Sequence, residues 1–223
     1  MTADNTVMHS SGLVGLTPAA PSAARRAGMR ATEHVTSVPI FYVSRAIDLQ
    51  PALQQGKPHG VTPTEILVIA AANALRAYPA AHACLLDGVV QRYTSTRVAV
   101  LVRSGDALVP LVFPDAETAT AVELRQDRAR LQDQLANKKL SADRMAAPTF
   151  VISNLGTYGV DWFTAVLFPG TAMTLAVGRT NGSDSSTTVN AVLTCDHRIV
   201  DGVDGAEFLI ALERAAREVT ISQ

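Results

Sequence analysis

Of the five histidines in the chain, His197 is the one whose surroundings point to chemistry. It lies in 194–202 (TCDHRIVDG), where an apolar strand-like run ends and a polar turn closed by glycine begins. A strand end delivers a side chain rigidly, and an imidazole can accept and return a proton near neutral pH. His197 is therefore a candidate general base, and Asp201 could shape its turn or hold a cation. An alternative stays open, in which Asp196, Arg198 and Asp201 form a salt-bridged turn without a role for His197.

A second polar corner follows another strand-like run. In 149–156 (TFVISNLG) an apolar stretch leads into Ser153 and Asn154. A hydroxyl fixed at such a corner can donate a hydrogen bond to a developing oxyanion, but serine and asparagine are also ordinary turn residues, and both interpretations stay open. Ser153 lacks the flanking glycines of a hydrolase nucleophile, so we interpret it as a candidate oxyanion donor.

The elements that would position these residues follow from hydrophobic periodicity. Strands with β-branched or alternating apolar residues outnumber amphipathic helices two to one, which is typical of an α+β fold in a single domain. The patterns predict strands at 40–44, 97–102, 108–113, 149–153, 171–177 and 188–195, and helices at 62–78, 118–139 and 203–219.

The beginning of the chain has a different composition. Residues 1–34 are rich in alanine, serine, threonine and proline, which predicts a flexible N-terminal segment with room for one short helix. A folded domain is expected at 35–223. The segment contains a small basic cluster, interpreted as solvated surface charge unless an acid elsewhere needs a partner, made of Arg25, Arg26 and Arg30.

Composition excludes several classes of protein. Because 19 basic residues face 20 acidic ones, bulk charge does not favour nucleic-acid binding. No apolar run approaches the ~18 residues of a membrane helix, and the first residues lack the features of a secretory signal, so a cytoplasmic protein without a membrane partner is expected. The two cysteines, Cys84 and Cys195, form neither a disulfide framework nor a zinc motif, and no metal is expected.

Residues 196–202 (DHRIVDG) resemble the DHRxxDG signature of the catalytic domain of 2-oxoacid dehydrogenase acyltransferases. Chloramphenicol acetyltransferase has a related His-x-x-x-Asp-Gly motif and the same fold. Residues 150–159 (FVISNLGTYG) resemble the family's F-T-I-S-N-L-G segment, and the similarity extends over about 35–219. The resemblance implies a chloramphenicol acetyltransferase-like mixed β-sheet sandwich packed with helices. It also implies acetyl-CoA as co-substrate and no bound cofactor.

The resemblance further assigns roles to single residues. His197 would deprotonate the acceptor thiol or hydroxyl, and Ser153 would hydrogen-bond the tetrahedral oxyanion. Family members form trimers in which the histidine of one subunit meets the serine of its neighbour, so a homotrimer is expected. Substrate-binding roles fall to Asn154, Gly156 and Gly202. Asp201 would be a structural acid paired with an arginine, for which the candidates are Arg25, Arg26, Arg30 and Arg198.

The acceptor is predicted from what the sequence lacks. There is no lipoyl-type Asp-Lys-Ala motif and no length for a lipoyl domain, so the chain resembles the stand-alone acyltransferases of tetronate polyketide pathways. The first expectation is O-acetylation of a hydroxymethyl tetronate, a small-molecule acceptor in antibiotic biosynthesis. One alternative is the dihydrolipoyllysine-residue acyltransferase core of a 2-oxoacid dehydrogenase complex. The other is a non-catalytic assembly core of the same fold.

Overall fold

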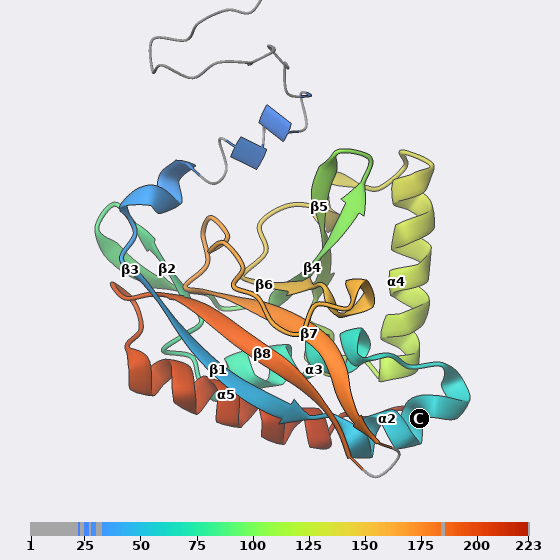
Figure 1. Cartoon of the computed structure of the whole chain (residues 1–223). Coiled ribbons are helices and arrows are strands. Elements are labelled where there is room, and N and C mark those ends of the chain that lie inside the picture. Colours follow the sequence, from blue (N-terminus) through green and yellow to red (C-terminus); the bar gives the residue numbers. More distant parts are fainter. Residues whose placement is uncertain (1–21, 23–24, 27, 30–32, 184–185, 223) are drawn as a thin grey trace, which may run out of the picture.

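The computed structural model describes residues 22, 25–26, 28–29, 33–183 and 186–222 (Figure 1). Its centre is a six-stranded sheet in the order β1-β8-β7-β6-β4-β5. β6 runs parallel to both of its neighbours, β4 and β7, whereas all other pairs are antiparallel. The strands are β1 (Ile40–Asp48), β4 (Arg97–Ser104), β5 (Ala107–Pro114), β6 (Phe150–Asn154), β7 (Met173–Ser183) and β8 (Ser186–Asp196).

Helices cover one face of this sheet. α3 and α5 pack against each other beneath the sheet, and α4 stands beside β4 and β5 (Figure 1). The buried carboxylate of Glu65 accepts the N–H of Thr62 and closes the first turn of α3. Glu65 also pairs with Arg128 at 2.5 Å, which ties α4 to α3. The α-helices are α2 (Gln50–Gly56), α3 (Pro63–Ala77), α4 (Ala121–Ala136) and α5 (Gly202–Arg217). Short 3₁₀ turns are η1 (His34–Ser37), η2 (Lys57–His59), η3 (Ala116–Thr118), η4 (Ala142–Arg144) and η5 (Gly156–Tyr158).

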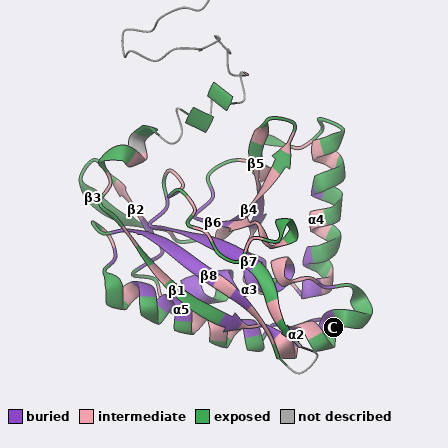
Figure 2. Cartoon of the chain, in the orientation of Figure 1, coloured by how far each residue is buried: buried purple, intermediate pink, exposed green. Residues whose placement is uncertain are grey.

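Alternation along the strands gives the two faces of the sheet different cores. The helix-covered face holds the main core, in which the rings of Phe150 and Phe208 lie 5.4 Å apart. The loop 155–172 lies on part of the opposite face, where Phe168 packs on the sheet and the Ala165 carbonyl oxygen accepts the Thr194 hydroxyl at 2.7 Å. Figure 2 shows the buried residues of the central strands in purple. This face carries a smaller apolar group, which we call the loop-side cluster. It consists of the buried Ala99, Val112 and Val151, with the less buried Leu101 and Phe168 packed on them.

The predicted α+β class is confirmed, and each of the six predicted strands and three predicted helices is present. Helix α2 was not predicted, nor was a two-stranded hairpin formed by β2 (Ala83–Leu86) and β3 (Val89–Arg92). Asp87 and Gly88 make its two-residue turn with φ values of 50° and 77°. An Asp-Gly pair between apolar runs is a strong hairpin signal, so this element was predictable from the sequence.

The hairpin is anchored by His82, whose side chain is buried. Its Nε2 lies 2.9 Å from Thr149 Oγ1, which also accepts the backbone N–H of Arg97 at 3.0 Å. Burial lowers the pKa of His82 below its usual 6.5, against a smaller opposing effect of the Glu117 carboxylate. The neutral imidazole is therefore the form that suits the folded state.

The lowered pKa of His82 predicts acid sensitivity of the fold. Below pH 6.5 the unfolded chain binds a proton at His82 that the folded chain resists, so the free energy of unfolding falls as the pH drops through this range. Denaturant unfolding near neutral pH and about two units lower measures the loss. His82→Gln keeps a side-chain nitrogen for Thr149 without titrating, and should lose part of the sensitivity. Equal acid sensitivity in both proteins would count against His82 as its source.

Candidate active site

His197 directly follows β8 in an exposed turn. Its backbone N–H donates to the carbonyl oxygen of Pro39 at 2.8 Å. Its ring lies against Phe41, with 4.7 Å between centroids and an interplanar angle of 54°. Pro39 directly precedes β1 and Phe41 lies in it, and β1 pairs with β8. The imidazole is thus placed by two strands of a rigid sheet and stays accessible to a substrate.

Asp196, the last residue of β8, is buried beside His197 and pairs with Arg198. Its carboxylate accepts the backbone N–H of Arg198 at 3.0 Å, Nε at 2.9 Å and Nη2 at 2.7 Å. These bonds raise the pKa of Arg198 and fix the residues on both sides of the histidine. Arg198 is therefore a partner of Asp196, which corrects its assignment as a candidate partner of Asp201. A salt-bridged turn was the alternative interpretation of this segment. It is present, but it contains Asp196 and Arg198 and not Asp201.

Asp201 caps the N-terminus of α5. Its Oδ1 accepts the N–H groups of Val203 at 2.8 Å and Asp204 at 3.0 Å, and the Asp204 carboxylate accepts the Asp201 N–H at 2.8 Å. The hydroxyl of Tyr78, just after α3, donates to Asp204 at 2.7 Å. The Asp201 N–H, followed by the Tyr78 hydroxyl, holds the pKa of Asp204 below its usual value, and the same bond raises the pKa of Tyr78. The turn from His197 to Asp201 is thereby fixed to α3.

Asp201 forms no ion pair with an arginine among the residues that the structure describes. Arg25 and Arg26 are exposed and helical ahead of β1, whereas Arg30 lies outside the described residues, together with most of segment 1–34. Within the chain, Asp201 acts as a helix cap. Its pairing with one of the three N-terminal arginines stays a prediction.

Ser153 is half-buried near the end of β6, on the face away from α3 and α5. It pairs in register with Ala176 of β7, whose side chain is buried. Within the described part of the chain, its hydroxyl makes no hydrogen bond, so its donor is available to an incoming group.

The predicted substrate-binding residues have different surroundings. Asn154 donates to Thr64 Oγ1 at 3.3 Å, and its Oδ1 accepts the N–H of Gly156 at 2.8 Å. A Cβ at Gly156 would lie 2.6 Å from the carbonyl oxygen of Gly178, so this turn requires glycine. Gly202 opens α5, with open space around its Cα. Asn154 and Gly156 form the turn after β6, and contact of any of these three residues with substrate stays a prediction.

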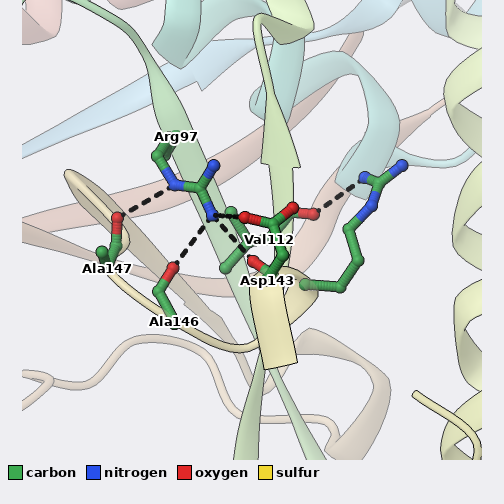
Figure 3. A network of polar contacts seen from close by, with 6 residues as sticks. Arg97, Val112, Asp143, Ala146 and Ala147 are labelled. Carbon is green, nitrogen blue, oxygen red and sulfur yellow. Dashed lines mark hydrogen bonds and ion pairs between the residues drawn. The ribbon is translucent and has the colours of Figure 1, made fainter. Parts of the chain in front are cut away.

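The segment that leads into β6 is fixed by Arg97 of β4 (Figure 3). Its Nη2 donates to the carbonyl oxygen of Asp143 at 2.7 Å and of Ala146 at 3.1 Å, and its Nε donates to that of Ala147 at 3.2 Å. The backbones of Arg97 and Thr149 also join, because the Thr149 N–H donates to the Arg97 carbonyl oxygen at 2.9 Å. These bonds set where β6 begins and therefore where its last residues lie.

Strand register keeps Ser153 and His197 apart within one chain. Ser153 pairs with Ala176, Ala176 pairs with Val192, and His197 lies five residues beyond Val192. At about 3.3 Å per residue along a strand and about 4.8 Å between strands, the two residues are about 19 Å apart. A base and an oxyanion donor must both contact the reacting acyl group. Within one chain, the two residues are therefore too far apart to contact the same acyl group.

Among the described residues, no group of three or more His, Cys, Asp or Glu side chains is placed to hold a metal ion. No helix in the described ranges combines the length and apolar character needed to cross a membrane.

Sequence reasoning missed three residues that fix the candidate base, namely Phe41, Tyr78 and Asp204. The Asp-x-x-Asp spacing of Asp201 and Asp204 resembles a capping box and could have revealed the second carboxylate. Phe41 and Tyr78 reach the site through strand pairing and helix packing, for which the sequence contains no local signal.

Comparison with known proteins gives a consistent result. Residues 22–220 match the family model of the 2-oxoacid dehydrogenases acyltransferase (catalytic domain). The chain is 34% identical over 186 residues to component 4 of the chloroplastic pyruvate dehydrogenase complex of Arabidopsis thaliana, a dihydrolipoyllysine-residue acetyltransferase, covering 78% of this chain and 39% of that protein. It is 28% identical over 203 residues to the corresponding acetyltransferase of Rickettsia bellii, covering 83% and 49%. The chain thus spans about half the length, or less, of these relatives.

Solved structures show the same fold. The truncated catalytic core of the 2-oxoacid dehydrogenase multienzyme complex of Thermoplasma acidophilum superposes with a TM-score of 0.84 at 22% identity, covering 91% of this chain and 99% of that one. A chloramphenicol acetyltransferase gives 0.54 at 14% identity, covering 85% and 92%. The predicted chloramphenicol acetyltransferase-like fold is confirmed.

Proposed function

We propose that this chain, which belongs to the 2-oxoacid dehydrogenase acyltransferase family through its catalytic domain, moves an acyl group from a coenzyme A thioester to an acceptor. The observation that supports this best is the DHRIVDG turn, in which Asp196 and Arg198 hold an accessible His197 at a strand end. This turn and Ser153 both lie inside the matched region.

In the proposed reaction, the imidazole of His197 takes the proton from the acceptor S–H or O–H. The resulting sulfur or oxygen anion attacks the thioester carbonyl carbon, and the hydroxyl of Ser153 donates to the oxyanion that forms. When the tetrahedral intermediate collapses, the bond from carbon to the coenzyme A sulfur breaks, and His197 returns its proton to that sulfur. No bound cofactor enters these steps.

The complete site forms between two copies of the chain, in this proposal, because one chain holds the two groups about 19 Å apart. A homotrimer joins the His197 of each copy to the Ser153 of a neighbour. Support comes from large apolar side chains left exposed on β1 and on the loop 155–172, on the side of the sheet away from the helices. They are Ile40, Tyr42, Trp162 and Val166.

The proposed acceptor is the thiol of a dihydrolipoyl group, because the similar curated proteins are dihydrolipoyllysine-residue acetyltransferases. Acetylation of a tetronate hydroxyl, the first expectation from the sequence, has no support among these relatives. The hydroxymethyl tetronate is therefore included in the test as the competing acceptor.

The test offers acetyl-CoA with dihydrolipoamide or with a hydroxymethyl tetronate, and quantifies free coenzyme A and acetylated product by chromatography. We expect product with dihydrolipoamide and none with His197→Ala. Product with the tetronate alone would replace the proposed acceptor. No product with either acceptor would overturn the acyltransferase proposal and favour a non-catalytic assembly core.

A further inference from the structure

The loop-side cluster lies directly beside Ser153. Val151 precedes Ser153 by two residues on the same face of β6, which is about 6.6 Å along the strand. Leu101 follows Val100, which pairs with Ile152, so Leu101 lies next to Ser153 on the neighbouring strand. The cluster is separate from the main core beneath the helices, and its half-buried members, Leu101 and Phe168, keep some accessible apolar surface on the same face as the Ser153 hydroxyl.

Phe168 is the part of this cluster that comes from a loop, and its backbone is held firmly. Its N–H donates to Thr174 Oγ1 at 2.9 Å, and its carbonyl oxygen accepts the N–H of Thr171 at 3.1 Å and the Thr171 hydroxyl at 2.8 Å. The hydroxyl of Tyr93 donates to the carbonyl oxygen of Gly170 at 2.5 Å, which ties the same turn to the end of the β2–β3 hairpin. The backbone that carries the Phe168 ring is thus fixed, and the ring packs on the buried members of the cluster.

We propose that the loop-side cluster receives the hydrocarbon part of the acyl group and that Phe168 limits its length, so that the enzyme prefers acetyl over longer chains. This inference rests on the proposed function. With the thioester oxygen hydrogen-bonded to Ser153 Oγ, the acyl carbons lie against the half-buried Leu101, the cluster member beside Ser153 on the neighbouring strand. An acetyl group ends there, whereas each added methylene reaches toward the Phe168 ring.

The chemistry of the cluster favours an acyl chain over the other groups at such a site. Its five side chains are aliphatic or aromatic. The hydroxyl of Thr174, the register partner of Val151, is already engaged by the Phe168 N–H. The amide groups of coenzyme A would leave buried polar atoms without partners here, which is costly. A hydrocarbon chain gains from the same surface.

The experiment measures kcat/KM for acetyl-, propionyl- and butyryl-CoA, with whichever acceptor is active in the test above. Wild type should favour acetyl-CoA. Phe168→Ala should raise the ratio of butyryl to acetyl about tenfold or more, because one or two methylenes change discrimination by that amount, and Phe168→Leu should raise it less. Val98→Ala, a buried truncation on the helix-covered face of β4, is the matched control and should leave the ratio unchanged.

Thermal unfolding of each variant shows whether it is folded, and Phe168→Leu decides the matter if Phe168→Ala does not fold. An unchanged ratio in a folded, active Phe168 variant would overturn this inference while leaving the proposed function intact. A change confined to the KM of the acceptor would overturn it as well, since the cluster would then hold the acceptor. Wild type without turnover of any thioester would overturn the proposed function, and this inference with it.

Discussion

Replacing His197 by alanine is expected to lower kcat by about 10²–10⁴-fold, the usual contribution of a positioned general base. The fold should survive, because the side chain is exposed and the backbone bond to Pro39 does not depend on it. Coenzyme A release and thermal unfolding, measured on the same preparation, check both parts.

Phe41→Leu is the matched control for His197→Ala, because it removes the ring contact and keeps the base. It should cost far less activity than the loss of the imidazole. Turnover near the wild-type rate in His197→Ala would refute the proposed mechanism. A variant that has lost its unfolding transition would instead require His197→Gln, which keeps a polar side chain of similar reach.

Two inactive chains should restore activity to each other when they assemble together. Ser153→Ala alone is expected to lower the rate by about 10²–10³-fold, as the loss of one oxyanion donor does. If each site takes His197 from one copy and Ser153 from the next, a trimer that contains both His197→Ala and Ser153→Ala chains keeps one of its three sites intact. Activity should then return to about a third of wild type, far above either variant alone.

Co-expression with two different affinity tags, followed by purification over both, supplies the mixed assembly for this measurement. The matched control is the same double purification of two copies of His197→Ala, which should stay inactive. A mixed assembly no more active than its parents would show that each site is built within one chain.

The sequence predicted the strands and helices because their hydrophobic periods are strong and local. It also located His197 and Ser153, since each stands where an apolar run meets a polar turn. It could not predict how far apart they lie, because that distance depends on the register of β6, β7 and β8, which is set by long-range pairing.

The choice among the candidate partners of Asp201 meets the same difficulty. Arg198 is close to both Asp196 and Asp201 in sequence, and only the turn geometry decides between them. The turn directs Arg198 back to Asp196, while the backbone N–H groups of α5 occupy Asp201. The local sequence is compatible with pairing of Arg198 to either Asp196 or Asp201. Only the three-dimensional path of the turn shows which carboxylate the guanidinium contacts.

In the proposed assembly, the strand register that separates Ser153 from His197 also makes catalysis subject to mass action. An isolated chain would keep its fold but would contain only the general base of one site and the oxyanion donor of another. Specific activity should therefore fall on dilution below the dissociation constant of the assembly and recover on concentration. The fraction of active enzyme then depends on the subunit concentration, and the activity per chain directly measures how far the chains have associated.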